Sequence, residues 1–246
     1  MKEEIMKIDN PVARLYDLLI EGKKKNVNES CKDVWMALLG AKNESELFSK
    51  LSLVLTLPEK INTVLSQSAS KEDYATQYWE NQIDAAFSNQ SLISSWSTFI
   101  NRIDNNALTE LRLLKTIVNT KGAFEKIDDK DLFEVKSQLS ALLDEIIESD
   151  LNQAVKEKIC KYLRKIISTI EDYKISGIEP IMDAINTTMG NAFFDSPYRT
   201  FLSENSLGGK IIKCISAIAD SITTIQGLPP VATLAIELFN RKNTDE

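Results

Sequence analysis

The fold is decided most clearly by residues 129–176, which read DKDLFEVKSQLSALLDEIIESDLNQAVKEKICKYLRKIISTIEDYKIS. Apolar residues recur there every three or four positions, first from Leu132 to Ile146 and then from Val155 to Ile170. This spacing is typical of amphipathic helices, because strands alternate instead. We therefore predict two long helices over residues 129–148 and 149–176. Since the connection between them is very short, we expect an antiparallel hairpin.

The same periodicity extends along nearly the whole chain, and residues 92–103 show it as well. No stretch has the strict alternation of a strand. Helix-capping residues precede many of the periodic segments and glycines follow them: Asn10, Asn28, Asn43 and Asn106 at the starts, and Gly22, Gly40 and Gly122 at the ends. We predict an all-α fold, a multi-helix bundle of about a dozen amphipathic helices.

The periodicity lapses between Thr120 and Asp131, which is where we expect a boundary between two helical subdomains. The N-terminal subdomain would span residues 1–122. The C-terminal one would span residues 123–246 and contain the hairpin of residues 129–176. A chain of 246 residues buries roughly 70–75% of its unfolded surface, so it needs no disulfide or metal to form a core.

The chain has no histidine, and its three cysteines, Cys31, Cys160 and Cys214, lie far apart. Without histidine, Ser-His-Asp and Cys-His catalysis and most zinc sites are excluded. Carboxylate chemistry stays open, but no pair of acidic residues points to it. We therefore expect no catalytic residue, no cofactor and no metal, and hence no enzyme.

The formal net charge of −7 opposes nucleic-acid binding by the surface as a whole, because phosphates are repelled. The opening MKEEIMKIDNP shows no apolar signal sequence, and the unpaired cysteines suit a reducing cytoplasm, which is the location we expect. The uncharged run at residues 221–236 has 16 residues, fewer than the roughly 20 of a membrane-spanning helix. We predict no transmembrane segment.

The first candidate binding site is the stretch of residues 190–209, which we expect to be irregular. It concentrates bulky aromatic residues beside an arginine: Phe193, Phe194, Tyr198, Arg199 and Phe201. Aromatic and arginine side chains often anchor protein interfaces, so we predict that these five contact a protein partner. The alternative is that the stretch folds back, that its aromatic residues complete the core, and that Pro197 opens a short helix.

A second candidate is the basic side of the helix over residues 149–176. Four basic residues lie beside its apolar seam: Lys158, Lys161, Arg164 and Lys165. They could contact an acidic partner, RNA or an anionic lipid. The alternative is a surface that neutralises itself, since Glu157 precedes Lys161 by four residues and the preceding helix ends in the acidic residues Asp144, Glu145 and Glu148.

Two short motifs resemble ligand sites but lack essential residues. Residues 208–210, Gly-Gly-Lys, are not a phosphate loop, because Glu204 stands where the first glycine is required and Ile211 replaces the serine or threonine. The aspartates at 128, 129 and 131 lack the glycine and glutamate that a calcium loop needs further along. Three acidic residues suit a helix N-terminus instead.

The N-terminal quarter resembles a known group. Residues 10–40, NPVARLYDLLIEGKKKNVNESCKDVWMALLG, and a following segment with LTLPEKI at residues 55–61 resemble uncharacterised all-helical bacterial accessory proteins from mobile-element and defence neighbourhoods. The resemblance implies a bacterial accessory protein and carries no catalytic motif. We therefore predict a non-enzymatic protein-binding or adaptor protein, an accessory subunit of a defence-type multi-protein system. The alternative is a membrane-active helical effector that uses residues 207–239. The oligomeric state is left open.

Overall fold

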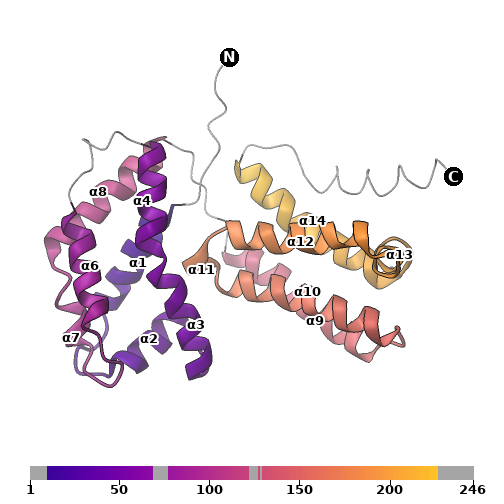
Figure 1. The fold of residues 1–246 in the computed structure, drawn as a ribbon, viewed down its shortest axis with the longest axis horizontal. Helices are drawn as coiled ribbons and strands as arrows, with labels where there is room; N and C mark the ends of the chain where they lie inside the picture. The colour runs from indigo at the N-terminus through magenta and orange to yellow at the C-terminus, as the bar shows by residue number, and fades with distance from the viewer. Residues whose placement is uncertain (1–9, 69–76, 122–126, 128, 227–246) are drawn as a thin grey trace, which may run out of the picture. The chain divides into compact units, whose positions relative to one another are not determined.

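The computed structural model describes residues 10–68, 77–121, 127 and 129–226 (Figure 1). These residues form helices and connecting turns without any strand, so the all-α prediction is confirmed. They divide into two compact units. The first contains the described residues up to 121 together with Lys174–Ser176, and the second contains residues 127–173 and 177–226. The predicted subdomains differ from these units because the short segment at 174–176 belongs with the first unit.

The first unit is built from helices that bury one face each. α1 packs against α8, α4 and α2, and α6 packs against α8. The bounds of the helices are α1 Pro11–Lys23, α2 Cys31–Leu39, α3 Glu44–Leu55, α4 Leu57–Ser68, α6 Tyr78–Ser88, α7 Ser97–Ile100 and α8 Asn105–Lys121.

Local capping chemistry explains where several of these helices begin and end. Asn10 caps α1, and Asn43 caps α3 by accepting a hydrogen bond from the backbone N–H of Glu46 at 2.9 Å. Glu46 in turn accepts from the backbone N–H of Lys42. α2 ends because Gly40 adopts φ +62°, a left-handed conformation that glycine reaches without strain.

Two predicted caps are wrong by a few residues. α2 is capped by Ser30 rather than Asn28. α8 is capped by Asp104 rather than Asn106, because the Asp104 carboxylate accepts hydrogen bonds from the backbone N–H groups of Asn106 and Ala107, both at 2.9 Å. Neighbouring polar residues all have capping chemistry, so only the backbone geometry decides between them.

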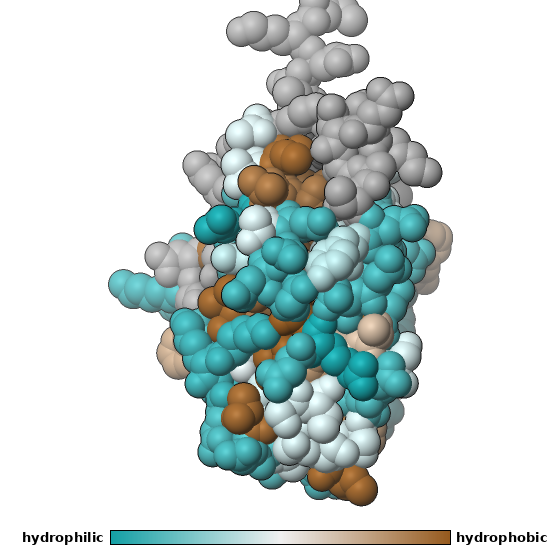
Figure 2. All heavy atoms as spheres, turned by 90° about the vertical axis from the view of Figure 1, so that its left-hand side faces the viewer, coloured by the Kyte–Doolittle hydropathy of each residue, from teal (hydrophilic) through white to brown (hydrophobic). Residues whose placement is uncertain are grey.

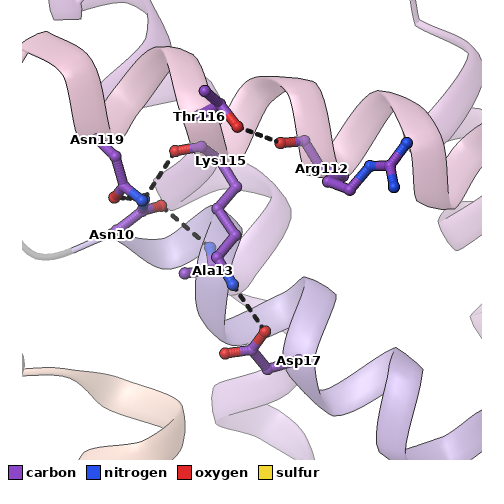
Figure 3. Close-up of polar contacts among 7 residues, drawn as sticks. All are labelled: Asn10, Ala13, Asp17, Arg112, Lys115, Thr116 and Asn119. Atoms are coloured by element: carbon purple, nitrogen blue, oxygen red, sulfur yellow. Dashed lines mark hydrogen bonds and ion pairs between the residues drawn. The ribbon is translucent and has the colours of Figure 1, made fainter.

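A polar network fastens the start of α1 to α8 (Figure 3). The buried amide of Asn10 donates to the Asn119 side chain at 2.7 Å and to the Lys115 carbonyl at 3.3 Å, while its oxygen accepts from the Ala13 N–H at 3.0 Å. Lys115 also forms an ion pair with Asp17 at 2.9 Å. One asparagine therefore caps α1 and positions it against α8.

Residues 92–103 are not the continuous helix that their periodicity predicts. Only α7 is helical there, because the preceding backbone pairs with the loop before α2: the Cys31 N–H donates to Ser94 O at 2.8 Å, and the Trp96 N–H donates to Glu29 O at 2.7 Å. The Trp96 indole donates to Gly22 O at 2.8 Å, inside a cluster in which Trp96 and Phe99 pack against Trp35. Trp96, Phe99, Ile100 and Ile103 are buried as their spacing indicates, although only Phe99 and Ile100 lie in a helix.

The second unit contains α9 Asp129–Glu148, α10 Gln153–Glu171, α12 Glu179–Phe194, α13 Ser196–Glu204 and α14 Ser206–Gln226. The short α11 Tyr173–Ser176 joins α10 to α12, and all of it except Tyr173 is grouped with the first unit. α9 and α10 run antiparallel. Lys136, near the start of α9, pairs with Glu171 at the end of α10, and Lys156, near the start of α10, donates to the Ile147 carbonyl near the end of α9.

The prediction that residues 190–209 are irregular is wrong. α12 continues through Gly190 to Phe194, α13 follows after one residue, and α14 starts at Ser206. The prediction treated glycine and proline as helix breakers. Pro197 instead lies in the first turn of α13, where its missing N–H has no helical partner to lose.

Gly208 lies at the crossing of α13 and α14. A Cβ atom on Gly208 would lie 2.1 Å from the carbonyl oxygen of Phe201 and 2.7 Å from the Cα of Leu202. Only a residue without a side chain allows the two helices to approach this closely. In the Gly-Gly-Lys sequence, Gly208 therefore serves helix packing.

No helix within the described ranges is long and apolar enough to cross a membrane. Residues 227–239 of the apolar region 207–239 lie outside the described residues, as does the helix end predicted at Gly122. Figure 2 views the side on which α6 and α8 lie in Figure 1, and hydrophobic residues there form small separate patches on a mainly hydrophilic surface.

Candidate functional site

The five predicted partner-binding residues separate into an exposed and a buried group. Phe194 is 93% exposed and Phe193 is 44% exposed at the end of α12. Tyr198 and Phe201 of α13 are 1% and 5% exposed and belong to the core of the second unit. Arg199 is half-buried between the two extremes. Tyr198 and Phe201 therefore follow the alternative prediction, that aromatic residues of this stretch complete the core, and are not surface anchors.

Tyr198 is buried because α13 turns one face toward the unit's core. Tyr198, Phe201 and Leu202 have helical spacing and form that face. The Tyr198 ring packs against the ring of Tyr162 on α10, with centroids 5.4 Å apart. Burial, with a smaller effect from Tyr162, raises the pKa of the Tyr198 hydroxyl above its usual range. Tyr198 therefore holds α13 on α10.

Asp195 makes polar contacts at the same junction of α10 and α13, and the sequence analysis did not predict them. Its carboxylate caps α13 by accepting from the Tyr198 N–H at 2.9 Å, and it also forms an ion pair with Lys158 of α10. The signal for the cap was present, since an aspartate two residues before Pro197 is a typical helix start. The pairing with Lys158 joins residues that are far apart in sequence, so no local pattern could reveal it.

The exposed phenylalanines are distinctive among the described residues. The large hydrophobic side chains that are well exposed are Val27, Phe48, Leu55, Tyr78, Ile93, Leu113, Phe133, Ile147, Phe193 and Phe194. Phe193 and Phe194 form the one pair that is adjacent in sequence, and Phe194 has the highest exposed fraction of the set. Single exposed apolar residues are ordinary, whereas adjacent aromatic residues indicate a contact surface.

Lys158 of α10 lies beside this end of α12, since it pairs with Asp195. Lys161, Arg164 and Lys165 are exposed, and within the described part of the chain none of them has an ion-pair partner. Of the four predicted basic residues, only Lys158 is paired, through Asp195.

Two of the acidic residues predicted to neutralise this surface, Glu157 and Glu145, make other contacts. Glu157 accepts a hydrogen bond from Gln153 at 2.8 Å rather than pairing with Lys161, and Glu145 of α9 pairs with Lys210 of α14 at 2.7 Å. The explanation of a self-neutralising surface is therefore wrong for Lys161, Arg164 and Lys165.

The other sequence candidates do not form a site. Among the described residues, no group of three or more acidic or cysteine side chains could hold a metal ion. Cys31, Cys160 and Cys214 are buried, and the Cys214 thiol donates to the Gln138 side chain at 3.5 Å. Burial raises the pKa of Cys214 and outweighs the opposite effect of the neighbouring Lys213, so this thiol is not activated for nucleophilic chemistry.

Comparisons of the chain with protein-family models, with curated proteins and with solved structures reveal no match. The exposed surface at the junction of α10, α12 and α13 therefore has to be interpreted from its own residues. We call Phe193, Phe194, Lys161, Arg164 and Lys165 the α10/α12 surface.

Proposed function

We propose that this chain is a non-enzymatic protein-binding or adaptor protein and that the α10/α12 surface contacts its protein partner. The observation that carries the proposal is the exposed pair Phe193 and Phe194. Leaving a phenylalanine side chain fully exposed costs about 1.5–3 kcal/mol relative to burying it. A partner that covers the side chain recovers this free energy. Aromatic side chains that become buried on binding often dominate the energetics of protein interfaces.

The rest of the unit supports a rigid presentation of these residues. Phe194 is followed directly by Asp195, which is fixed by its cap on α13 and by its ion pair with Lys158. A rigid anchor loses little conformational entropy on binding. The resemblance of residues 10–40 to bacterial accessory proteins supports extending the proposal to an accessory subunit of a defence-type multi-protein system in the cytoplasm.

The test is quantitative co-purification from the native host with matched variants. Phe194→Ser removes the proposed anchor, and Phe133→Ser removes a phenylalanine of α9 that is 70% exposed in the same unit. We expect Phe194→Ser to lose a stoichiometric protein partner that both the wild type and Phe133→Ser retain. All three proteins should melt at similar temperatures, because both side chains are mainly in solvent.

Equal partner recovery with Phe194→Ser and Phe133→Ser would contradict the proposal. Liposome flotation of the chain with and without residues 207–239 provides the comparison with the membrane-active alternative. Flotation that depends on that segment, in the absence of a protein partner, would favour the effector.

A further inference from the structure

The middle of α10 carries positive charge only. Residues 158–170 include Lys158, Lys161, Arg164 and Lys165 and no acidic residue. The last three are exposed and unpaired within the part of the chain that the structure describes. Because the whole chain has a formal net charge of −7, this surface is a local reversal of the overall sign. A cluster of exposed cations without intramolecular partners attracts an anionic group.

The ion pair of Lys158 with Asp195 locates this charge relative to the phenylalanines. Asp195 directly follows Phe194, so the start of the basic side of α10 lies at the exposed end of α12. Lys161 and Lys165 follow Lys158 by one and two helical turns, about 5 and 10 Å along the axis. The unpaired cations therefore follow Lys158 along α10, starting from the end of α12 at which Lys158 pairs with Asp195.

We infer that the partner contacts this surface through an acidic protein segment that also contributes an apolar side chain. Its apolar residue packs on Phe194, and its carboxylates pair with Lys161, Arg164 and Lys165. This inference rests on the proposed function and specifies the chemistry of the partner. Complementary charge around an apolar anchor fixes the orientation of a bound segment and accelerates its association.

A protein segment fits this surface better than RNA or a lipid bilayer does. Exposed carboxylates precede and follow the basic residues on α10 itself, Glu157 before Lys158 and Glu171 after Lys165. A continuous phosphate backbone or a flat anionic membrane would approach these carboxylates as well as the cations, which is unfavourable. A short peptide places its own charges individually, so it pairs with the three cations and leaves the flanking acids in water.

The first experiment identifies the contacting chemistry directly. The photo-crosslinking amino acid p-benzoylphenylalanine replaces Phe194 in the full chain, in the native host, and the same replacement at Phe133 is the control. After irradiation, the segment attached at position 194 is sequenced by mass spectrometry. We expect a protein segment with a net negative charge and an apolar residue at the crosslink. A neutral or basic segment, an RNA or lipid adduct, or the absence of any specific adduct would each overturn the inference.

The second experiment measures the contribution of the charges. The crosslinked segment is synthesised as a labelled peptide and titrated with the wild type and with the triple variant Lys161→Glu, Arg164→Glu, Lys165→Glu. We expect the triple variant to bind at least about tenfold more weakly, and the affinity of the wild type to fall with added salt. The control variant is Lys42→Glu, Lys60→Glu, Lys213→Glu, which has the same net charge and should bind like the wild type.

These variants distinguish a failure of the acidic-segment inference from a failure of the proposed function. Equal binding by both triple variants, with binding still lost in Phe194→Ser, would overturn the acidic segment and leave the proposed function standing. Binding that is insensitive to Phe194→Ser as well would overturn both. Melting temperatures near that of the wild type verify that the exposed substitutions leave the protein folded.

Discussion

Gly208 and Gly209 form a natural matched pair for testing how α13 and α14 pack. A Cβ at Gly208 would lie 2.1 Å from the Phe201 carbonyl oxygen and 2.7 Å from the Leu202 Cα, which are both backbone atoms of α13. A Cβ at Gly209 would find no atom within 4 Å. Gly208→Ala and Gly209→Ala therefore add the same methyl group to neighbouring positions of one helix, with and without a clash.

The distances determine the expected magnitudes. Carbon atoms pack at about 3.5–4.0 Å, so Gly208→Ala forces α13 and α14 apart by about 1 Å or more. Overpacking of this kind costs typically about 1–3 kcal/mol, and a clash with two backbone atoms belongs at the upper end. Gly209→Ala replaces a helical glycine without a clash and should stabilise by about 0.5–1 kcal/mol. Both variants gain the same helix propensity, so we expect them to differ by the cost of the clash, about 2–3 kcal/mol.

Equilibrium denaturation in urea, followed by far-UV circular dichroism, measures this difference. The chain's three tryptophans, Trp35, Trp79 and Trp96, all lie in the first unit, so their fluorescence reports on that unit separately. We expect Gly208→Ala to shift the dichroism transition more than the fluorescence transition. Equal stability of Gly208→Ala and Gly209→Ala would refute the close approach of α13 and α14 at Gly208.

Three further predictions concern buried side chains. Tyr198→Ala should destabilise the protein by about 3–5 kcal/mol as a core truncation, whereas Phe194→Ala should change the melting temperature little; similar melts for both would show that Tyr198 is not core. Because burial raises the pKa of Tyr198 in the folded state, Tyr198 contributes stability that is complete below about pH 10, the unfolded pKa, and is lost as the pH rises toward the folded value. In urea denaturation, Tyr198→Phe should therefore lose less stability than the wild type between about pH 9 and 11. An identical loss in both proteins would count against the effect. Trp96→Phe removes the buried indole hydrogen bond to Gly22 O and should cost about 1–3 kcal/mol in the same assay; wild-type stability would mean that the bond contributes nothing.

Half of the candidate site could be predicted from the sequence. The concentration of aromatic residues between 193 and 201 and the four basic residues of α10 can both be recognised in the sequence. The exposure of Phe194 and the burial of Tyr198, four residues apart, were not predictable. Both are aromatic, and which side of a helix meets a core depends on the helices that pack against it.

The sequence by itself determined the helical class and most helix positions, because those depend on local properties. Apolar residues at helical spacing, Asn10 before Pro11, and Gly40 after α2 act within one or two turns of chain. The bounds predicted for α9 match the structure for the same reason, whereas the single helix predicted over 149–176 is divided into α10 and α11.

Only the tertiary structure decided how those helices use their residues. Residues 92–96 have helical spacing but pair with the loop before α2, and Gly208 looks like a breaker but lies in α14 where α13 crosses it. The ion pair between Lys158 and Asp195 joins two helices that are far apart in sequence. The physical reason is that packing and ion pairing depend on distances between distant segments, and local spacing shows which face of a helix is apolar without showing what covers it.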